Sequence, residues 1–362
     1  MRRDDARLRD DAAAVQGRGN RTLPASGNTQ DFNQKTRAYA GFGDFTYSVF
    51  GGLRLIGGIR YTHERKRLDG TLTTFATFVP PLVLRPTDTF TSTDYRAGAQ
   101  FDVSSTSMLY GTVASGFHSG GFFFTHDNPI YDPERLTSYT VGSKNRFLDN
   151  KVQLNVEGFI WKYKNQQLSG VSTDSAGSTV FATVNAARST IKGVEAELQV
   201  RPLRNTMLVA QAQYLASRFD VFRLIQPFPA STLSACTSTF VSAGRFAVDC
   251  TGQRLPQSPR WTLNLAAQQS FDVGNGKLTV DLREHYQTAS FTGVTFVPSE
   301  LQRGYWLGDL SVGYTSNDGW ALSGFINNFS DVTVKNNTTH VNVDSAQLRP
   351  PRTYGVRLSG HF

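Results

Sequence analysis

The segment Trp261-Thr-Leu-Asn-Leu-Ala-Ala-Gln-Gln-Ser270 alternates apolar and polar residues over most of its length. One set of alternate positions is apolar and contains Trp261, Leu263, Leu265 and Ala267. The other set is polar apart from Ala266, and it contains Thr262, Asn264, Gln268 and Ser270. Because successive side chains of a strand point to opposite faces, this period of two predicts a strand with one apolar and one polar face.

Two later segments repeat the pattern. From Lys277 to Tyr286 an apolar set opposes a polar one, and Glu284 interrupts the apolar phase; the apolar set is Leu278, Val280, Leu282 and Tyr286. Between Tyr305 and Tyr314 the apolar set begins with Trp306 and ends with Tyr314. Aromatic residues at both ends of an apolar stripe are typical of the interfacial girdles of a membrane barrel.

Short and long joints alternate between these segments. The short joints are rich in Gly, Asn, Asp, Ser or Pro, and they lie at Val49–Leu53, Asp102–Ser107, Leu148–Lys151, Pro202–Asn205, Asp272–Gly276 and Thr315–Gly319. The long joints lie at about Lys66–Thr91, Phe117–Arg135, Gln166–Arg188, Asp220–Pro259, Ser290–Arg303 and Asp331–Pro351. Short periplasmic turns and long external loops are what an outer-membrane barrel shows.

The segments predict an all-β fold: an incomplete, transmembrane, antiparallel β-barrel of about thirteen strands. We expect residues 1–34 to form a polar segment or external loop and residues 35–362 to form the strands. If the last strand ends in the periplasm, the first, at about Thr36 to Ser48, descends from outside. An even-stranded barrel would then lack an odd number of strands, so we expect this sheet not to close ideally.

Composition agrees with a barrel better than with a soluble enzyme. The 362 residues are 39% hydrophobic but only 18% charged, and their mean hydropathy is -0.32. No window holds the roughly 18 consecutive apolar residues of a membrane helix, so the sequence predicts membrane residence through strands. The first residues lack the apolar core of a signal peptide, which suggests a longer reading frame upstream.

The net charge of +8 raises nucleic acid as a partner, but the basic residues are scattered. The one dense cluster, His63 to Arg67, also contains Glu64 and is interpreted as a solvated strand end. We therefore expect no nucleic-acid partner.

Cys236 and Cys250 lie in a stretch rich in Ser, Thr, Ala and Gly. We expect one loop disulfide formed in an oxidising compartment, because two Cys fall short of the four ligands of a structural zinc site. The alternative is a pair of free thiols in a cytosolic protein.

Several sequence segments resemble the barrel of TonB-dependent outer-membrane receptors. They run in the family's order from Tyr110-Gly-Thr-Val-Ala-Ser-Gly-Phe117 through Ile191-Lys-Gly-Val-Glu-Ala-Glu-Leu198 and Leu255-Pro-Gln-Ser-Pro-Arg-Trp261 to Phe325-Ile-Asn-Asn-Phe-Ser-Asp331 and Pro351-Arg-Thr-Tyr-Gly-Val-Arg-Leu358. The resemblance covers about residues 36 to 362.

The resemblance implies the C-terminal part of a 22-stranded barrel, with the plug, the TonB box and the first strands missing. It implies a receptor in the outer membrane of a Gram-negative bacterium that takes up a scarce ligand, most often a ferric siderophore, with energy from the TonB complex acting through the plug. It also implies that the barrel-assembly machinery recognises the last strand through Tyr354, Val356, Leu358 and the terminal Phe362, by strand addition.

The sequence offers no catalytic constellation and no cofactor motif, so we expect neither an enzyme nor a bound cofactor. Gly116 to Gly121 lacks the Lys-Ser/Thr of a phosphate loop, and His118 and His126 are interpreted as solvated loop residues. Four charged residues are expected to face the lumen, where they could guide a substrate, hold the plug or merely keep the interior wet: Asp281, Arg283, Asp309 and Arg357.

Two other functions stay open from the sequence. A passive, porin-like channel would have a complete, closed and even-numbered set of strands. An extracellular β-rich adhesin would be soluble without detergent.

Overall fold

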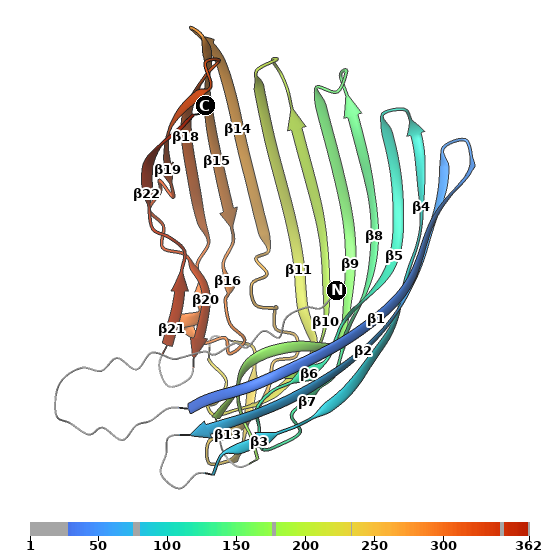
Figure 1. Ribbon diagram of the computed structural model, residues 1–362, viewed down its shortest axis with the longest axis vertical. Helices are drawn as coiled ribbons and strands as arrows, with labels where there is room; N and C mark the ends of the chain where they lie inside the picture. Colours follow the sequence, from blue (N-terminus) through green and yellow to red (C-terminus); the bar gives the residue numbers. More distant parts are fainter. Residues whose placement is uncertain (1–27, 75–79, 176–178, 233, 341–343, 361–362) are drawn as a thin grey trace, which may run out of the picture.

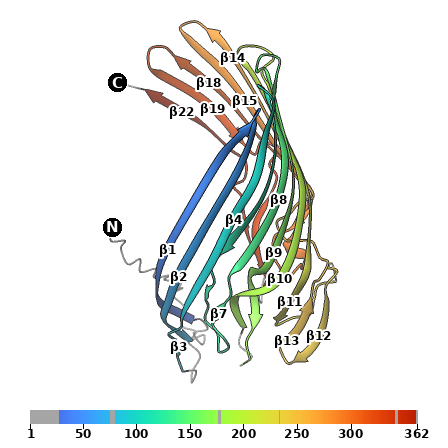
Figure 2. The same ribbon diagram turned by 90° about the vertical axis from the view of Figure 1, so that its right-hand side faces the viewer.

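A computed structural model describes residues 28–74, 80–175, 179–232, 234–340 and 344–360. Figures 1 and 2 show one large curved sheet with short turns at one end and long joints at the other. Its main path is antiparallel and follows chain order: β1 (Asn28–Phe50), β2 (Leu53–Thr74), β4 (Thr87–Ser104), β5 (Ser107–His118), β8 (Glu134–Phe147), β9 (Val152–Thr173), β10 (Thr179–Val200), β11 (Thr206–Gln226), β14 (Trp261–Val273), β15 (Gly276–Gln287), β18 (Tyr305–Ser316), β19 (Trp320–Asn327) and β22 (Thr353–Gly360).

Shorter elements occupy the long joints. β3 (Leu82–Leu84) pairs with β2, and β13 (Arg245–Asp249) joins β11 to β12 (Thr237–Ser242). Three small sheets are formed by β6 (Gly121–Phe122) with β7 (Ile130–Tyr131), β16 (Ser290–Phe291) with β17 (Leu301–Gln302), and β20 (Lys335–His340) with β21 (Asp344–Leu348). The 3-10 helix η1 (Pro298–Glu300) lies in the same region, and no helix among the described residues is long and apolar enough to cross a membrane.

The thirteen strands of the main path confirm the expected all-β fold and strand count. Within the described residues, β1 and β22 each keep one unpaired edge, so the sheet is open. Of the segment 1–34, residues 28–34 belong to β1, while residues 1–27 lie outside the described part of the chain. Strand β1 therefore starts before the expected Thr36.

Three of the expected long joints are shorter than the sequence suggested. β2 continues to Thr74, β9 and β10 keep pairing from Gln166 with Ala187 out to Thr173 with Thr179, and β11 continues past Asp220 to Gln226. The physical reason is that residues which favour extended backbone continue past the expected ends: Thr71, Thr73 and Thr74 in β2, and Val, Thr and Phe residues in β9, β10 and β11. A polarity pattern marks the end of the stripe and not the end of the ladder.

Register aligns the apolar residues of neighbouring strands into rows. Leu282 pairs with Leu310, which pairs with Ile326, which pairs with Tyr354. Val280 pairs with Val312 in the next row. We call this side of the sheet the outer face, and many of its large apolar side chains are exposed, including Leu282, Leu310 and Tyr354. The opposite side, the inner face, carries polar residues such as Asn264 and Thr279 at the alternate positions.

The short turns have the backbone that their residues allow. Gly51 and Gly52 join β1 to β2 with φ of 45° and 88°, values that favour glycine. The β8–β9 turn places Leu148, Asp149 and Asn150 at positive φ, between 51° and 65°. Asp and Asn tolerate this region better than most residues.

A cluster of buried apolar residues lies at the end of the sheet with the long joints. Its centre is Phe219, Phe222 and Phe296, whose side chains are at most 1% exposed. The Phe219 and Phe222 rings lie 4.4 Å apart, and Phe296 approaches Phe222 edge-on at 6.5 Å. We call this cluster the loop core. Because it packs residues of several long joints together, the joints form an ordered structure at this end of the sheet.

Glycine is required where aromatic side chains cross the inner face. A Cβ on Gly193 would lie 2.4 Å from the Phe159 ring and 2.9 Å from the Tyr214 carbonyl oxygen. Phe159 is buried and stacks on Trp161 with ring centroids 4.5 Å apart. An added methyl group therefore meets both a packed ring and a fixed backbone atom.

We predict that Gly193→Ala lowers the free energy of unfolding by about 1–3 kcal/mol, because overpacking forces the ring and strand apart. Urea unfolding in detergent micelles, followed by tryptophan fluorescence, measures the change. Gly324→Ala is the matched control, since a Cβ at Gly324 would meet nothing within 4 Å. Equal effects of the two substitutions would contradict the packing argument.

Candidate functional site

Three carboxylates gather on the inner face where β9 and β10 run side by side. Glu157 pairs directly with Glu195, and Glu197 follows two residues later on the same face. They line an open hollow of 460 Å³ together with Tyr110 and Lys144, so the wall carries three acids and one lysine. Like charges directly opposite each other destabilise a sheet unless something compensates them.

Each carboxylate has a neutral hydrogen-bond donor. Tyr110 Oη donates to Glu157 Oε2 at 2.6 Å, and Gln213 Nε2 donates to Glu195 Oε1 at 2.6 Å. Asn155 Nδ2 reaches Glu197 Oε2 at 3.5 Å. These donors hold the acids in place without neutralising them, so the inner wall attracts positive charge from the space it encloses.

The four charged residues singled out from the sequence all lie on the inner face but form no single cluster. Arg283 and Asp309 are register partners on β15 and β18, and Arg357 lies opposite Ser323. Asp281 accepts a hydrogen bond from Gln268 Nε2 at 3.1 Å, and Asp309 accepts one from the Asn328 amide at 2.8 Å. Among the described residues, none of the four takes part in an ion pair within 4 Å.

A pocket of 280 Å³ opens among the long joints. Its walls are mostly apolar and include Leu168, Val171, Phe222 and Val294. Arg245, Thr173 and Asp127 add polar groups, and Asp127 already accepts hydrogen bonds from the Ser175 amide and hydroxyl. Two buried atoms, Arg245 Nε and Thr173 Oγ1, have no hydrogen-bond partner among the described residues. Leaving a buried donor unpaired costs about 1–3 kcal/mol, so the pocket is suited to a ligand that supplies acceptor oxygens.

A second pocket, of 350 Å³, adjoins the first one and shares Gly170, Val171 and Val294 with it. It is closed on one side by a turn built around Glu300, whose side chain accepts hydrogen bonds from the Phe296 amide at 2.7 Å and the Thr295 amide at 3.1 Å. Burial raises the pKa of the Glu300 carboxyl, although these hydrogen bonds oppose the shift. The β20–β21 hairpin is held to the same turn, because Lys335 Nζ donates to the Ser299 carbonyl at 2.6 Å.

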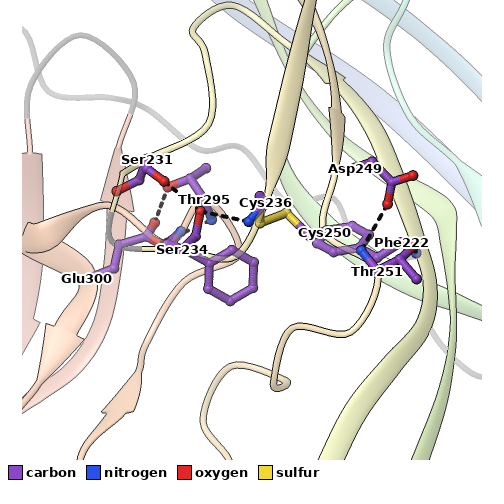
Figure 3. Close-up of a disulfide and its surroundings, with 10 residues drawn as sticks. Phe222, Ser231, Ser234, Cys236, Asp249, Cys250, Thr251, Thr295 and Glu300 are labelled. Carbon is purple, nitrogen blue, oxygen red and sulfur yellow. Dashed lines mark hydrogen bonds between the residues drawn. A yellow bond between two sulfur atoms is a disulfide. The ribbon is translucent and has the colours of Figure 1, made fainter.

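Cys236 and Cys250, the pair expected to form a disulfide, are joined by an S–S bond in the structure. Figure 3 shows this bond between the segment carrying Ser234 and the segment carrying Thr251, with Glu300 on a neighbouring loop. Cys250 is 1% exposed and belongs to the loop core. The disulfide thus joins the two ends of the β12–β13 hairpin, and the Cys250 amide links the hairpin to β11 by donating to the Phe222 carbonyl at 2.8 Å.

The two loop histidines are separate from these pockets. His126 Nδ1 lies 2.7 Å from Asp174 Oδ2, so it has a carboxylate partner. His118 is exposed at the end of β5, opposite Glu134. The described residues contain no group of three or more His, Cys, Asp or Glu side chains placed to hold a metal ion.

The Asp249 carboxylate, next to Cys250, is stabilised in its ionised form by the folded loop. Hydrogen bonds from the side chain and amide of Thr251, reinforced by the Arg223 guanidinium, lower the pKa of Asp249 to about 2. The Thr251 amide lies 2.9 Å and Arg223 Nε 2.8 Å from the two carboxylate oxygens. The folded loop therefore prefers the ionised carboxylate.

We predict that this contribution is complete above the ordinary pKa of 3.8 and is lost as the pH falls toward about 2. Hydrogen exchange at Thr251 and its neighbours, corrected for intrinsic pH dependence, should show protection falling across that interval. Asp249→Asn should flatten the dependence. Unchanged protection in the parent chain from pH 4 to pH 2 would refute the assignment.

The model of the family described as TonB dependent receptor-like, beta-barrel, matches residues 3–329. The ferric yersiniabactin uptake receptor FyuA of Yersinia pestis superimposes with a TM-score of 0.72 at 16% identity, over 91% of this chain and 46% of that one. The siderophore receptor PiuA of Acinetobacter baumannii gives 0.70 at 19% identity, over 91% and 43%. The copper transporter OprC gives 0.58 at 12% identity, over 92% and 58%.

This chain therefore spans less than half the length of FyuA and PiuA, and at these identities the likeness to solved structures concerns the fold. The family model extends over most of the sequence, in agreement with the open thirteen-strand sheet, its short turns and its built-up long joints. The chain belongs to the family of TonB-dependent receptors, and it matches the β-barrel part of these proteins.

Proposed function

We propose that this chain is part of a receptor in the outer membrane of a Gram-negative bacterium, and that the receptor takes up a ferric siderophore with energy from the TonB complex. The observation that carries the choice of ligand is the pocket containing Arg245 and Thr173, whose buried donors lack partners among the described residues. A ferric siderophore presents carbonyl or anionic oxygens around its iron, and such oxygens accept hydrogen bonds from guanidinium and hydroxyl groups.

Polarity supports the location. The outer face carries the exposed apolar rows and the inner face carries the acids, amides and hydroxyls. We propose that the outer face contacts lipid and that the end with the long joints, including both pockets, faces the outside of the cell. The ligand would then meet Arg245 before it reaches the inner wall of the barrel.

The inner wall supports a role for a separate, basic element inside the barrel. Glu157, Glu195 and Glu197 present three carboxylates to the enclosed space with one nearby lysine. We propose that a plug bearing cations contacts this wall and that Asp281, Arg283, Asp309 and Arg357 add further contacts. TonB would act on such a plug and not on the strands of this chain.

The passive channel is the alternative, and it requires the sheet to close on itself. The two free edges belong to strands of very different length, 23 residues in β1 and 8 in β22. Direct pairing of these strands would leave most of β1 without a partner, which is costly in a membrane. The length difference therefore favours a receptor barrel with other strands between these edges.

The last strand supports recognition by the barrel-assembly machinery. Tyr354, Val356 and Leu358 lie on the outer face of β22 and are 73% to 82% exposed. Phe362, the fourth residue expected in this motif, lies outside the described residues. We propose that the free edge of β22 pairs with the machinery while these side chains select the register.

We predict that Tyr354→Ser together with Leu358→Ser lowers the amount of chain inserted in outer membranes several-fold, because the apolar side of the strand is lost. Quantitative blotting of membrane fractions measures the effect. The paired control, Thr353→Ser with Ser359→Thr, changes the inner-face positions of the same strand. Equal insertion of the apolar-face variant and the parent would count against the proposal.

We predict that the chain, folded in neutral detergent micelles, binds a ferric hydroxamate or a ferric catecholate siderophore more tightly than the iron-free compounds. Arg245→Met should weaken binding at least about tenfold, because a charge-assisted hydrogen bond contributes roughly 1.5–3 kcal/mol. Quenching of tryptophan fluorescence gives the dissociation constants. Arg218→Met is the matched control, since Arg218 pairs with Asp220 at 3.2 Å outside the pocket.

Copper(II) and vitamin B12 are included as competing ligand classes. Binding of copper(II) alone would overturn the siderophore assignment and leave receptor activity in place. Equal loss of affinity in Arg218→Met and Arg245→Met would remove the pocket from the proposal.

A further inference from the structure

Cationic side chains face each other on the outer side of neighbouring strands. Lys35 pairs with Arg67 and Arg37 with Arg65 across β1 and β2, and Arg135 pairs with Lys164 across β8 and β9. We call these residues the cation band: Lys35, Arg37, Arg65, Arg67, Arg135 and Lys164. They occupy the same alternate positions as Tyr61 and Tyr139, which belong to the outer face, are exposed, and lie nearer the short turns in the same strands.

No member of the band forms an ion pair within 4 Å in the described part of the chain. Two carboxylates lie on the same face near Lys35 and Arg67: Asp69 is engaged by Arg85 at 3.2 Å, and Asp31 lines the same hollow as these two cations without coming within 4 Å of either. Arg135 donates only to neutral groups, the Ser92 hydroxyl and the Thr91 carbonyl, both at 3.3 Å. Like charges directly opposite each other destabilise an antiparallel pair, so three such pairs at one height require anions from outside.

The height of the band can be estimated from the strands. Twelve residues separate Leu53 from Arg65 in β2, and the same number separates Val152 from Lys164 in β9. At about 3.3 Å per residue this is about 40 Å along the strand, or about 30 Å along the membrane normal for a strand tilted by roughly 40°. The apolar band of such barrels is about 25 Å tall. The cations thus lie about 5 Å beyond it, at the level of lipid headgroups.

The band occupies one side of the sheet. Strands β14, β15, β18, β19 and β22 carry no Lys or Arg at their outer-face positions, and Glu284 on β15 is an acid there. Cations distributed evenly over the outer face would attract anionic lipid all round the barrel. The outer-face cations therefore gather on the β1–β11 part of the sheet, where Lys162, Lys192 and Arg218 also lie on this face. This uneven distribution indicates a local site.

We propose that the cation band binds the phosphate groups of lipid headgroups in the external leaflet. Each opposed pair places two cations where one phosphate can accept hydrogen bonds from both, which converts a repulsive contact into a bridged one. Arg135, which lies 5.9 Å from the centre of the Phe117 ring, also anchors at the interface through its aromatic neighbour. The site rests on the membrane location proposed above and is independent of the identity of the transported ligand.

The test uses the full chain in neutral maltoside micelles and measures its binding to added phosphatidic acid, with phosphatidylcholine as the zwitterionic comparison. We expect the parent chain to bind phosphatidic acid preferentially. Arg65→Gln with Arg67→Gln, and separately Arg135→Gln with Lys164→Gln, should each weaken this binding roughly 25-fold, about fivefold for each cation removed.

Two controls keep the test decisive. Arg146→Gln with Lys277→Gln removes two cations from the inner face and should leave lipid binding unchanged, and Arg65→Lys with Arg67→Lys should retain most of it. On the parent chain, raising salt from 50 to 500 mM should weaken binding, which tests the charge dependence even if a variant fails to fold. Parent-like binding in both outer-face variants, equal loss in the inner-face control, or no preference for phosphatidic acid would overturn the proposal. None of these results would alter siderophore binding measured at Arg245.

Discussion

Register between neighbouring strands is the constraint on which the rest of the structure depends. Each main-path strand is hydrogen-bonded to its neighbours in a fixed alignment, and a slip of one residue would move every side chain to the opposite face. The row from Leu282 to Tyr354 would then point inward, and Glu157 and Glu195 would point into the surface that carries the apolar rows. Face polarity, the acid cluster and the cation band are thus consequences of one alignment.

Much of the fold could be predicted from the sequence because its main determinants are local. Alternation from Trp261 to Ser270 and the turn residues Gly51 and Asn150 act over a few neighbours, so strand number and turn position followed. The ends of the strands did not follow. Pairing of Thr173 with Thr179 is decided by the partner strand, and the apolar residues of that extension, such as Leu168 and Val171, pack against other joints and do not continue the stripe of the outer face.

The candidate sites were harder to predict because they combine distant segments. The spacing of Glu195 and Glu197 places both on one face of a strand, which is the one local signal of the acid cluster. Their neighbour Glu157 is brought in only by the β9–β10 alignment. Nothing in the sequence around Arg245 shows that its Nε is buried in the same pocket as Thr173, because that pocket is formed by joints that are far apart in the chain.

The order of the sheet has a consequence for how the chain assembles. Every neighbour on the main path is also the next main-path strand in sequence, so hairpins can zip in turn at a low cost in closure entropy. The widest interruption lies between β11, which ends at Gln226, and β14, which starts at Trp261. The Cys236–Cys250 bond spans 14 residues of that interruption. Oxidation before insertion would therefore shorten the widest loop that has to close before the next main-path strand can pair.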